Sequence, residues 1–190
     1  PMRGHVQSLN VSVAAGVAHF YVPGQIIVPG DSASTAHNLV THESLFRLGI
    51  ASEYVVLLSE VALSVLLYVL LRPVSATLAL IAAAFRLVMT AIHGINLLNS
   101  FLVLRLIGNT GTEAAFGGAQ VTTLVRLFLD AHHDGFAIGI VFLIPHMFIL
   151  GYLIYVSGYI PRLLGVLFLL AGCGYLIDSA AQLFVPGYGA

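Results

Sequence analysis

Four long stretches of the chain consist almost entirely of Leu, Ile, Val, Phe, Ala and Gly, and most polar residues lie between them. A helix needs about 20 mainly apolar residues to cross the hydrocarbon of a bilayer, because each residue adds about 1.5 Å along its axis. A helix also satisfies its own backbone hydrogen bonds, as hydrocarbon requires. The pattern therefore predicts four membrane-spanning helices, over residues 51–71, 76–104, 136–156 and 163–184.

The chain before the first of these stretches is less regular. Residues 11–28 are apolar but are interrupted by His19, Pro23 and Gln25, so we expect a short or broken fifth membrane helix, with an interfacial segment as the alternative. Residues 32–46 follow a turn and cap-type residues and have mixed polarity. That pattern indicates an amphipathic helix lying at the membrane interface.

Short connections join the long stretches into one domain. Arg72-Pro73 should end the first long helix, because proline lacks a backbone donor and restricts the residue before it. The first two long helices should therefore form an antiparallel hairpin. Residues 120–134 have the pattern of an amphipathic helix that continues into the third long stretch, since only Gly135 intervenes. Residues 1–190 are thus predicted to form a single all-α domain, a polytopic transmembrane helical bundle.

The composition agrees with a membrane protein and excludes some functions. Hydrophobic residues make up 59% of the chain and charged residues 8%, whereas soluble domains contain about 25% charged residues. The chain has no lysine and a formal net charge of -1, so it lacks a basic surface that could hold nucleic acid. A water-soluble core and nucleic-acid binding are therefore excluded. The expected partners are membrane lipids and other membrane-protein subunits.

Ionisable residues also occur inside the predicted membrane helices, where each costs several kcal/mol unless it is paired or faces water. Glu53 and Glu60 are seven residues apart, which puts both carboxylates on one face of a helix. We expect Arg86, on the next helix, to form an ion pair with Glu60 or Asp178. Such a network either locks the helices together or forms a hydrated ligand or ion site. Its expected members are Glu53, Glu60, Arg86, His93, Asn96, Asn99 and Asp178.

Histidines supply the other candidate chemistry. A mononuclear metal site could use His132 or His133 with Asp134 and an acid from another helix. The alternative is a pair of helix-boundary histidines in contact with water. His132 and His146 lie about 20 Å apart along a helix, so they cannot share one metal ion. A haem or chlorin pigment would need one axial imidazole, for which His93 and His146 are the best candidates.

A close-packing motif lies at the start of the third long stretch. Gly135 and Gly139 have the GxxxG spacing, which lets two backbones approach closely in lipid. We expect this face to contact another chain or a tightly held cofactor.

Several short runs together carry a resemblance to a known family. They are IVPGD (27–31), LFRLGI (45–50), VLLRPV (69–74), FRLV (85–88), LFLD (127–130), GYLIYVSGYIPRLLG (151–165) and GYLID (174–178). As a set they resemble the bacterial integral membrane family called domain of unknown function 4386. Membership would imply a helical bundle of the bacterial inner membrane and would imply no activity. The positions that match the family pattern are Arg72, Arg86, Asp130, His132, His146 and Asp178, whereas His93 and His133 are particular to this chain.

Three function hypotheses follow. The preferred one is a non-enzymatic integral membrane subunit or scaffold in the bacterial inner (cytoplasmic) membrane, packed in a larger complex, for instance an energy-converting or pigment-binding one. The second is an intramembrane metal- or haem-dependent enzyme. Its residues would be Glu60, Arg86, His132, His146 and Asp178. The third is a small transporter or channel.

Overall fold

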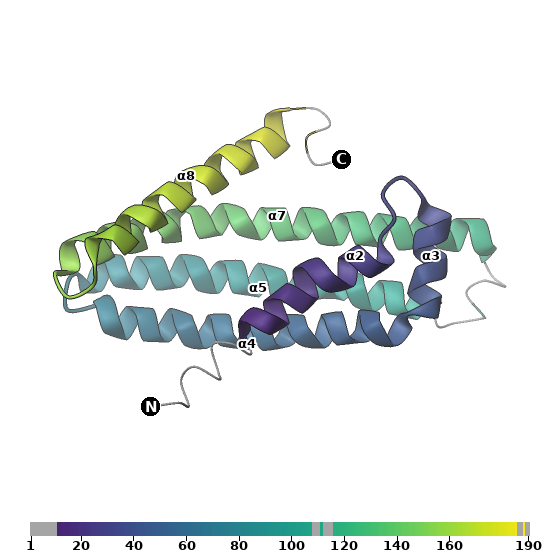
Figure 1. Ribbon diagram of the computed structural model, residues 1–190, viewed down its shortest axis with the longest axis horizontal. Helices are drawn as coiled ribbons and strands as arrows, with labels where there is room; N and C mark the ends of the chain where they lie inside the picture. Colours follow the sequence, from purple (N-terminus) through teal and green to yellow (C-terminus); the bar gives the residue numbers. More distant parts are fainter. Residues whose placement is uncertain (1–10, 108–110, 112–115, 186–187, 189–190) are drawn as a thin grey trace. The chain divides into compact units, whose positions relative to one another are not determined.

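The computed structural model describes residues 11–107, 111, 116–185 and 188, and these residues contain helices and no strand. Most of the loop that joins the second and third long stretches lies outside the described residues. The helical elements are η1 (Val17–Tyr21), α2 (Val22–Ile26), α3 (Ser32–Thr41), α4 (Glu43–Leu71), α5 (Ala76–Ile107), α7 (Gly118–Ser157) and α8 (Arg162–Phe184) (Figure 1).

Four of these helices, α4, α5, α7 and α8, are long and apolar enough to cross a membrane. The prediction of an all-α polytopic helical bundle is therefore confirmed, and each predicted span lies inside one of the four helices. Three of the helices begin before the predicted spans, α4 at Glu43, α7 at Gly118 and α8 at Arg162. The amphipathic residues 120–134 continue into the span 136–156 without interruption, as expected, which makes α7 a helix of 40 residues.

The helix predicted over residues 32–46 is shorter than expected, because the chain breaks at His42. The backbone of His42 has φ -114° and ψ 34°, which ends α3, and α4 begins at the next residue. Thr41 turns its hydroxyl back onto the carbonyl of His37 at 2.9 Å, a bond that competes with regular helix geometry. Glu43 then lies in the first turn of α4, where a negative charge is favoured by the helix dipole.

The first turn of α3 is held by side chains. Asp31 is the N-cap, and its carboxylate accepts hydrogen bonds from the backbone N–H of Ser34 at 2.9 Å and from the Ser34 hydroxyl at 2.6 Å. These two bonds hold the pKa of Asp31 below its usual range. Thr35 accepts a bond from the backbone N–H of Val28 at 3.0 Å, so the turn before the helix is also fixed.

The N-terminal segment is helical from residue 11 to residue 26 and contains a π-helical turn. In that turn the N–H of Val22 donates to the carbonyl of Val17, five residues back. The turn directly precedes Pro23, which has no N–H and whose ring disfavours the regular α-helical bond. Ile27 is extended and ends the helix. This segment is not among the described helices that are long and apolar enough to span a membrane.

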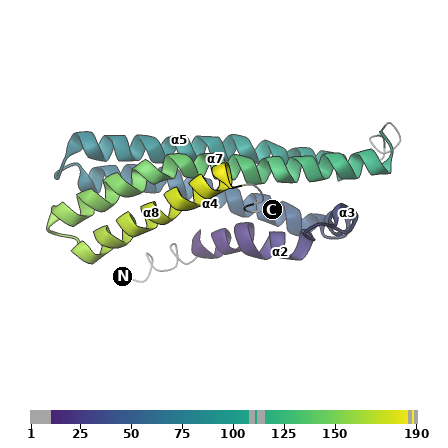
Figure 2. The same ribbon diagram turned by 90° about the horizontal axis from the view of Figure 1, so that it is seen from above.

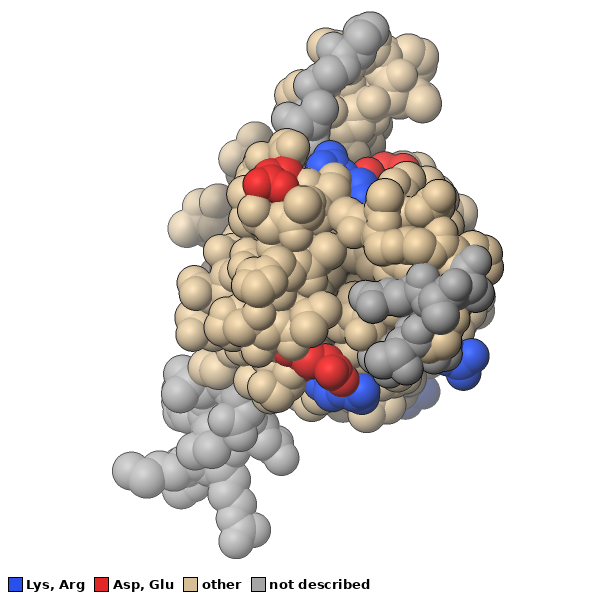
Figure 3. All heavy atoms as spheres, turned by 90° about the vertical axis from the view of Figure 1, so that its right-hand side faces the viewer, with Lys and Arg blue, Asp and Glu red and all other residues tan. Residues whose placement is uncertain are grey.

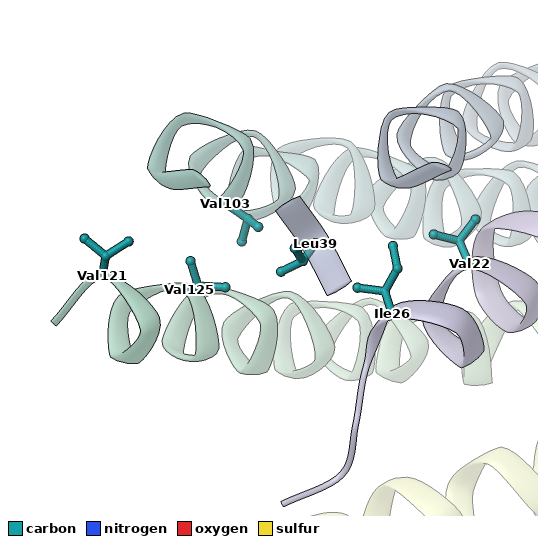
Figure 4. Packing of buried hydrophobic residues seen from close by; sticks show 6 residues of the cluster. All are labelled: Val22, Ile26, Leu39, Val103, Val121 and Val125. Carbon is teal, nitrogen blue, oxygen red and sulfur yellow. The ribbon is translucent and has the colours of Figure 1, made fainter. Parts of the chain in front are cut away.

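The chain divides into two compact units. The first contains residues Pro1–Ser59 and Gly94–Asp134, and the second contains Glu60–His93 and Gly135–Ala190, so α4, α5 and α7 each contribute to both. The first unit has its own apolar core, in which the N-terminal helix, α3, α5 and α7 bring their side chains together (Figure 4). The residues of this core are Val22, Ile26, Leu39, Val103, Val121 and Val125.

The second unit has a separate core and contains α8. Its buried apolar residues come from α4, α5 and α7 and are Leu71, Ala79, Leu150, Leu153 and Ile154. A tight turn with Gly158 at φ 75° leads from α7 into α8. Near this turn the hydroxyl of Tyr159 donates to the carbonyl of Leu70 at 2.6 Å, which satisfies an acceptor in the last turn of α4.

The helices α7 and α8 touch through their backbones. A Cβ placed on Gly165 would lie 2.7 Å from the carbonyl oxygen of Gly151 and 2.8 Å from the backbone nitrogen of Tyr155. A second close approach occurs at Gly172, where a Cβ would lie 3.3 Å from Met147. Figures 1 and 2 show that α8 starts against the end of α7 and then diverges from it. Only glycine permits the first of these contacts.

Two ion pairs lie on the exposed surface of the described helices, each between residues four apart. Arg47 Nη2 lies 2.7 Å from Glu43, and Arg126 Nε lies 3.2 Å from Asp130. Most of the face seen in Figure 3 is uncharged, and arginine atoms lie beside acidic atoms at its upper and lower edges. Such exposed pairs contribute only about 0–1 kcal/mol each, so they do not determine the fold.

The close approach of α7 and α8 predicts that Gly165→Leu destabilises the protein by about 1–3 kcal/mol, because the new side chain meets backbone atoms that cannot move unless the helices separate. Gly174→Leu on the same helix is the matched control, since nothing lies within 4 Å of a Cβ at that position. Thermal unfolding in detergent measures both variants. Equal losses from both would contradict the close contact.

The cap of α3 predicts a local pH dependence. Because the pKa of Asp31 is lowered in the folded state, its contribution is present above the unfolded value of about 3.9 and is lost as the pH falls through the lower folded value. The protection factor of the Ser34 amide, which is corrected for the intrinsic pH dependence of exchange, should therefore fall at acidic pH. Asp31→Asn keeps an N-cap without a titrating group and should remove this dependence. An unchanged acid dependence in that variant would assign it to another residue.

Candidate functional site

Three helices of the second unit each supply one polar side chain to a single cluster. Glu60 comes from α4, Arg86 from α5 and His146 from α7. Arg86 Nη2 forms an ion pair with Glu60 Oε2. Its other terminal nitrogen, Nη1, lies 3.0 Å from His146 Nε2. The side chains of Arg86 and Glu60 are 11% and 23% exposed, and His146 is 1% exposed, so this cluster is largely buried.

The partners of His146 determine where its proton lies. Its Nδ1 is 2.9 Å from the backbone carbonyl of Ala82, which can only accept, so Nδ1 carries the hydrogen. Its Nε2 faces the guanidinium of Arg86, which can only donate, so Nε2 presents its lone pair. His146 is therefore a neutral imidazole that uses both ring nitrogens. The cluster connects three helices through one ion pair, Arg86 with Glu60, and one charge-assisted hydrogen bond, Arg86 with His146.

Two atoms of this cluster have no hydrogen-bond partner among the described residues. Arg86 Nε is buried and makes no hydrogen bond. Glu60 Oε2 also lacks a hydrogen bond of good geometry, yet it is the atom that forms the ion pair with Arg86, so its charge is compensated. The ion pair predicted for Arg86 is thus present, and Glu60 is the partner.

The first unit contains a second polar cluster around His132 of α7. Its Nε2 lies 3.5 Å from Glu53 Oε1 of α4. Its Nδ1 lies 3.3 Å from the backbone carbonyl of Asn96 and 3.4 Å from the Ser100 hydroxyl, both on α5. In return, Asn96 Nδ2 donates to the backbone carbonyl of His132 at 2.7 Å. Two reciprocal bonds therefore join α5 to α7 at this level.

Asn99 fixes the orientation of the Asn96 amide. The Asn99 Nδ2 group donates to Asn96 Oδ1 at 2.9 Å, so the oxygen of Asn96 is identified by its donor and the nitrogen by its acceptor. The polar residues expected on α5 are thus in contact with α7. Glu53 and Glu60, predicted on one helix face, have different partners in different units: Glu53 meets His132, and Glu60 meets Arg86.

His93 packs against α7 in the second unit. Its ring stacks on Phe136 with a centroid distance of 4.5 Å, and its Nε2 lies 3.1 Å from the Phe136 carbonyl. A Cβ on Gly139 would collide with this imidazole. The expectation that Gly139 faces another chain or a cofactor is therefore wrong, because the buried space beside it is occupied by His93 of the same chain. Gly135 is partly buried.

The remaining candidate residues lie apart from these clusters. Asp178 on α8 accepts hydrogen bonds from Gln182 at 2.8 Å and from the Tyr188 hydroxyl at 3.0 Å, instead of pairing with Arg86. His133 and Asp134 are exposed. Within the described part of the chain, no group of three or more His, Cys, Asp or Glu residues is arranged to hold a metal ion.

The two proposed pigment ligands are already bonded. His146 would have to release both Arg86 and the Ala82 carbonyl before either nitrogen could bind a haem or chlorin. His93 would have to leave the Phe136 carbonyl and its stacked ring. An axial ligand needs an accessible lone pair, so the observed arrangement does not fit this role for either residue.

Two parts of the structure were not anticipated from the sequence. One is the contact between Gly151 and Gly165. The only sequence feature that could have indicated it is the presence of a glycine on each side of the predicted turn. The other is the position of His19, which interacts electrostatically with both Glu53 and His132. Because His19 lies in an apolar segment, the sequence indicated a buried polar side chain. It did not indicate which residues that side chain would contact.

Comparison with known proteins agrees with the helical architecture. An uncharacterised protein of Archaeoglobus fulgidus is 31% identical over 126 residues, which cover 66% of this chain and 61% of that protein. The match thus spans about three fifths of the relative's length, and the relative is archaeal, so a restriction to bacteria is not confirmed. No solved structure matches. The family model described as Domain of unknown function (DUF4386) matches residues 9–190, and the chain therefore belongs to that family of membrane proteins.

Proposed function

We propose that this chain is a non-enzymatic subunit or scaffold that packs against other membrane proteins in a larger complex of the cytoplasmic membrane. The observation that carries the proposal is the one-sided packing of α8. Its buried residues are Gly165 and Gly172, which are seven residues apart and face α7. In its most apolar part 11% of the residues are buried, compared with 39% in α7.

The outer side of α8 is not uniformly suited to lipid. Large apolar side chains such as Leu170, 62% exposed, and Ile177, 69% exposed, would be equally stable against lipid or protein. Asp178 is different, because a carboxylate on a helix surrounded by lipid is costly, and its two partners, Gln182 and Tyr188, are themselves exposed. A neighbouring membrane helix that offers a hydrogen-bond donor to Asp178 would lower this cost.

The internal polar clusters support a structural role for the rest of the network. Arg86 pairs with Glu60 and bonds to His146, so the three side chains join three helices. A buried ion pair of this kind specifies which helices pack together even where it adds little net stability. The enzyme hypothesis would need these residues to work with His132 and Asp178, yet the observed bonds place His132 with Glu53 and Asp178 with Gln182.

The subunit proposal predicts that crowding the outer side of α8 weakens association. Leu170→Trp combined with Ile177→Trp should reduce co-purification of partner proteins from native membranes about tenfold, a loss of about 1.4 kcal/mol, without changing the thermal stability of the chain. Leu98→Trp on α5 is the matched control, because Leu98 is 61% exposed. A chain that purifies as an isolated monomer, with no effect of either change, would refute the subunit role.

The structural role of the ion pair predicts a non-additive mutant cycle. Arg86→Leu should destabilise the protein by about 3–5 kcal/mol, because Glu60 is left as an unmatched buried charge, whereas Arg86→Leu with Glu60→Leu should cost clearly less. Denaturant unfolding in mixed micelles measures both. Arg47→Leu, in an exposed pair, should change stability by at most about 1 kcal/mol. A double variant as unstable as Arg86→Leu would show that the pair itself is not the cause.

A further inference from the structure

The two buried histidines of α7 have opposite surroundings. His146 faces one acceptor and one donor, so a neutral imidazole satisfies both contacts. His132 faces acceptors on both sides. Its Nδ1 lies 3.3 Å from the Asn96 carbonyl, and its Nε2 lies 3.5 Å from the carboxylate of Glu53. A neutral imidazole has only one N–H, so it cannot donate in both directions.

The carbonyl of Asn96, which faces Nδ1 of His132, has a fixed position. The Asn96 carbonyl belongs to the backbone of α5, and the side chain of the same residue donates to the His132 carbonyl at 2.7 Å. This reciprocal pair holds the imidazole of His132 against α5. A backbone carbonyl cannot donate, so the contact at 3.3 Å is a hydrogen bond when Nδ1 carries the hydrogen, and Nε2 then directs its lone pair at Glu53 unless one more proton is present. The Ser100 hydroxyl, 3.4 Å from Nδ1, can donate to Nδ1 in the other tautomer, but the Asn96 carbonyl then loses its donor and the Glu53 carboxylate keeps its charge.

We propose that Glu53 and His132 together form a site that binds one proton in the first unit. The proton lies either on Nε2, which gives an imidazolium beside a carboxylate, or on Oε1, which gives a carboxylic acid beside a neutral imidazole. In both forms a hydrogen occupies the space between the two atoms and the pair has no net charge. Without it, the negative charge of Glu53 would be uncompensated on a helix that can cross a membrane, whichever nitrogen of His132 carried the hydrogen.

The surroundings of the pair favour the neutral, protonated form. The side chains of His132 and Glu53 are 23% and 17% exposed, and both belong to helices that can cross a membrane, where a net charge is costly. The groups facing the pair are Asn96 and Ser100 of α5 and His19 of the N-terminal π turn. Among the described residues, His19 interacts electrostatically with both members of the pair, so it is a titratable group that could hold the proton instead.

The test is to locate this proton at pH 7 in the full chain, reconstituted in lipid nanodiscs. Histidine labelled with ¹³C and ¹⁵N distinguishes imidazolium from neutral imidazole by NMR, and loss of a signal in His132→Gln assigns it. Infrared spectroscopy detects a protonated carboxyl group. We expect either an imidazolium signal for His132 or a protonated carboxyl band that disappears in Glu53→Gln, with His146 neutral in the same sample.

The variant Glu53→Gln provides the decisive comparison. Its amide can donate to the Nε2 lone pair of His132, so the variant needs no extra proton and should bind one proton fewer than the wild type at pH 7. Glu43→Gln is the matched control on the same helix, because Glu43 belongs to an exposed pair with Arg47, and it should leave the His132 signal unchanged.

Two outcomes would overturn the proposal. The first is a neutral His132 in the wild type with no protonated carboxyl band that depends on Glu53. The second is a proton that disappears in His19→Asn while the His132 signal is unaffected, which would assign it to His19. The wild-type spectra alone separate the first outcome from the expected one, so the test does not depend on the folding of Glu53→Gln. It is also independent of the subunit role.

Discussion

The structure depends on one requirement, that a charge at membrane depth must meet its counter-charge within the same set of helices. Arg86 is the strongest example, because a guanidinium cannot lose its proton to escape the cost of burial. Its fork reaches Glu60 on one helix and His146 on another. The apolar residues around Arg86 could pack in several helix registers of similar stability. Only a few of those registers bring the three polar groups into contact. The ion pair thus contributes specificity more than net stability.

The same requirement explains why two histidines on one helix have different chemistry. His146 and His132 are both buried and both bond to a carbonyl of α5, at Ala82 and at Asn96. They differ in the group at the second nitrogen, which is a cation for one and a carboxylate for the other. A single neighbour therefore determines whether an imidazole in this protein acts as an acceptor or as half of a proton site.

The apolar pattern was sufficient to predict the fold class and the four long helices, because length and hydropathy alone determine what can cross a bilayer. It could not predict the partners of the polar residues. The spacing of Glu53 and Glu60 identified a shared face, but the partner that each carboxylate meets, His132 for one and Arg86 for the other, depends on the axial offset between helices. Similarly, the glycine pair at residues 135 and 139 predicted a close approach, and only the structure identifies His93 as the group that approaches Gly139. The break at His42 is a local change of backbone angles that hydropathy does not detect.

The contact between α7 and α8 has a consequence for the order of assembly. Gly151 and Gly165 lie on either side of a four-residue turn, residues 158–161, so the closest backbone contact in the second unit is also local in sequence. Closing so short a loop loses little chain entropy, and contacts that are local in sequence form rapidly. The α7–α8 hairpin can therefore close as soon as both helices have entered the bilayer, before α8 meets any partner.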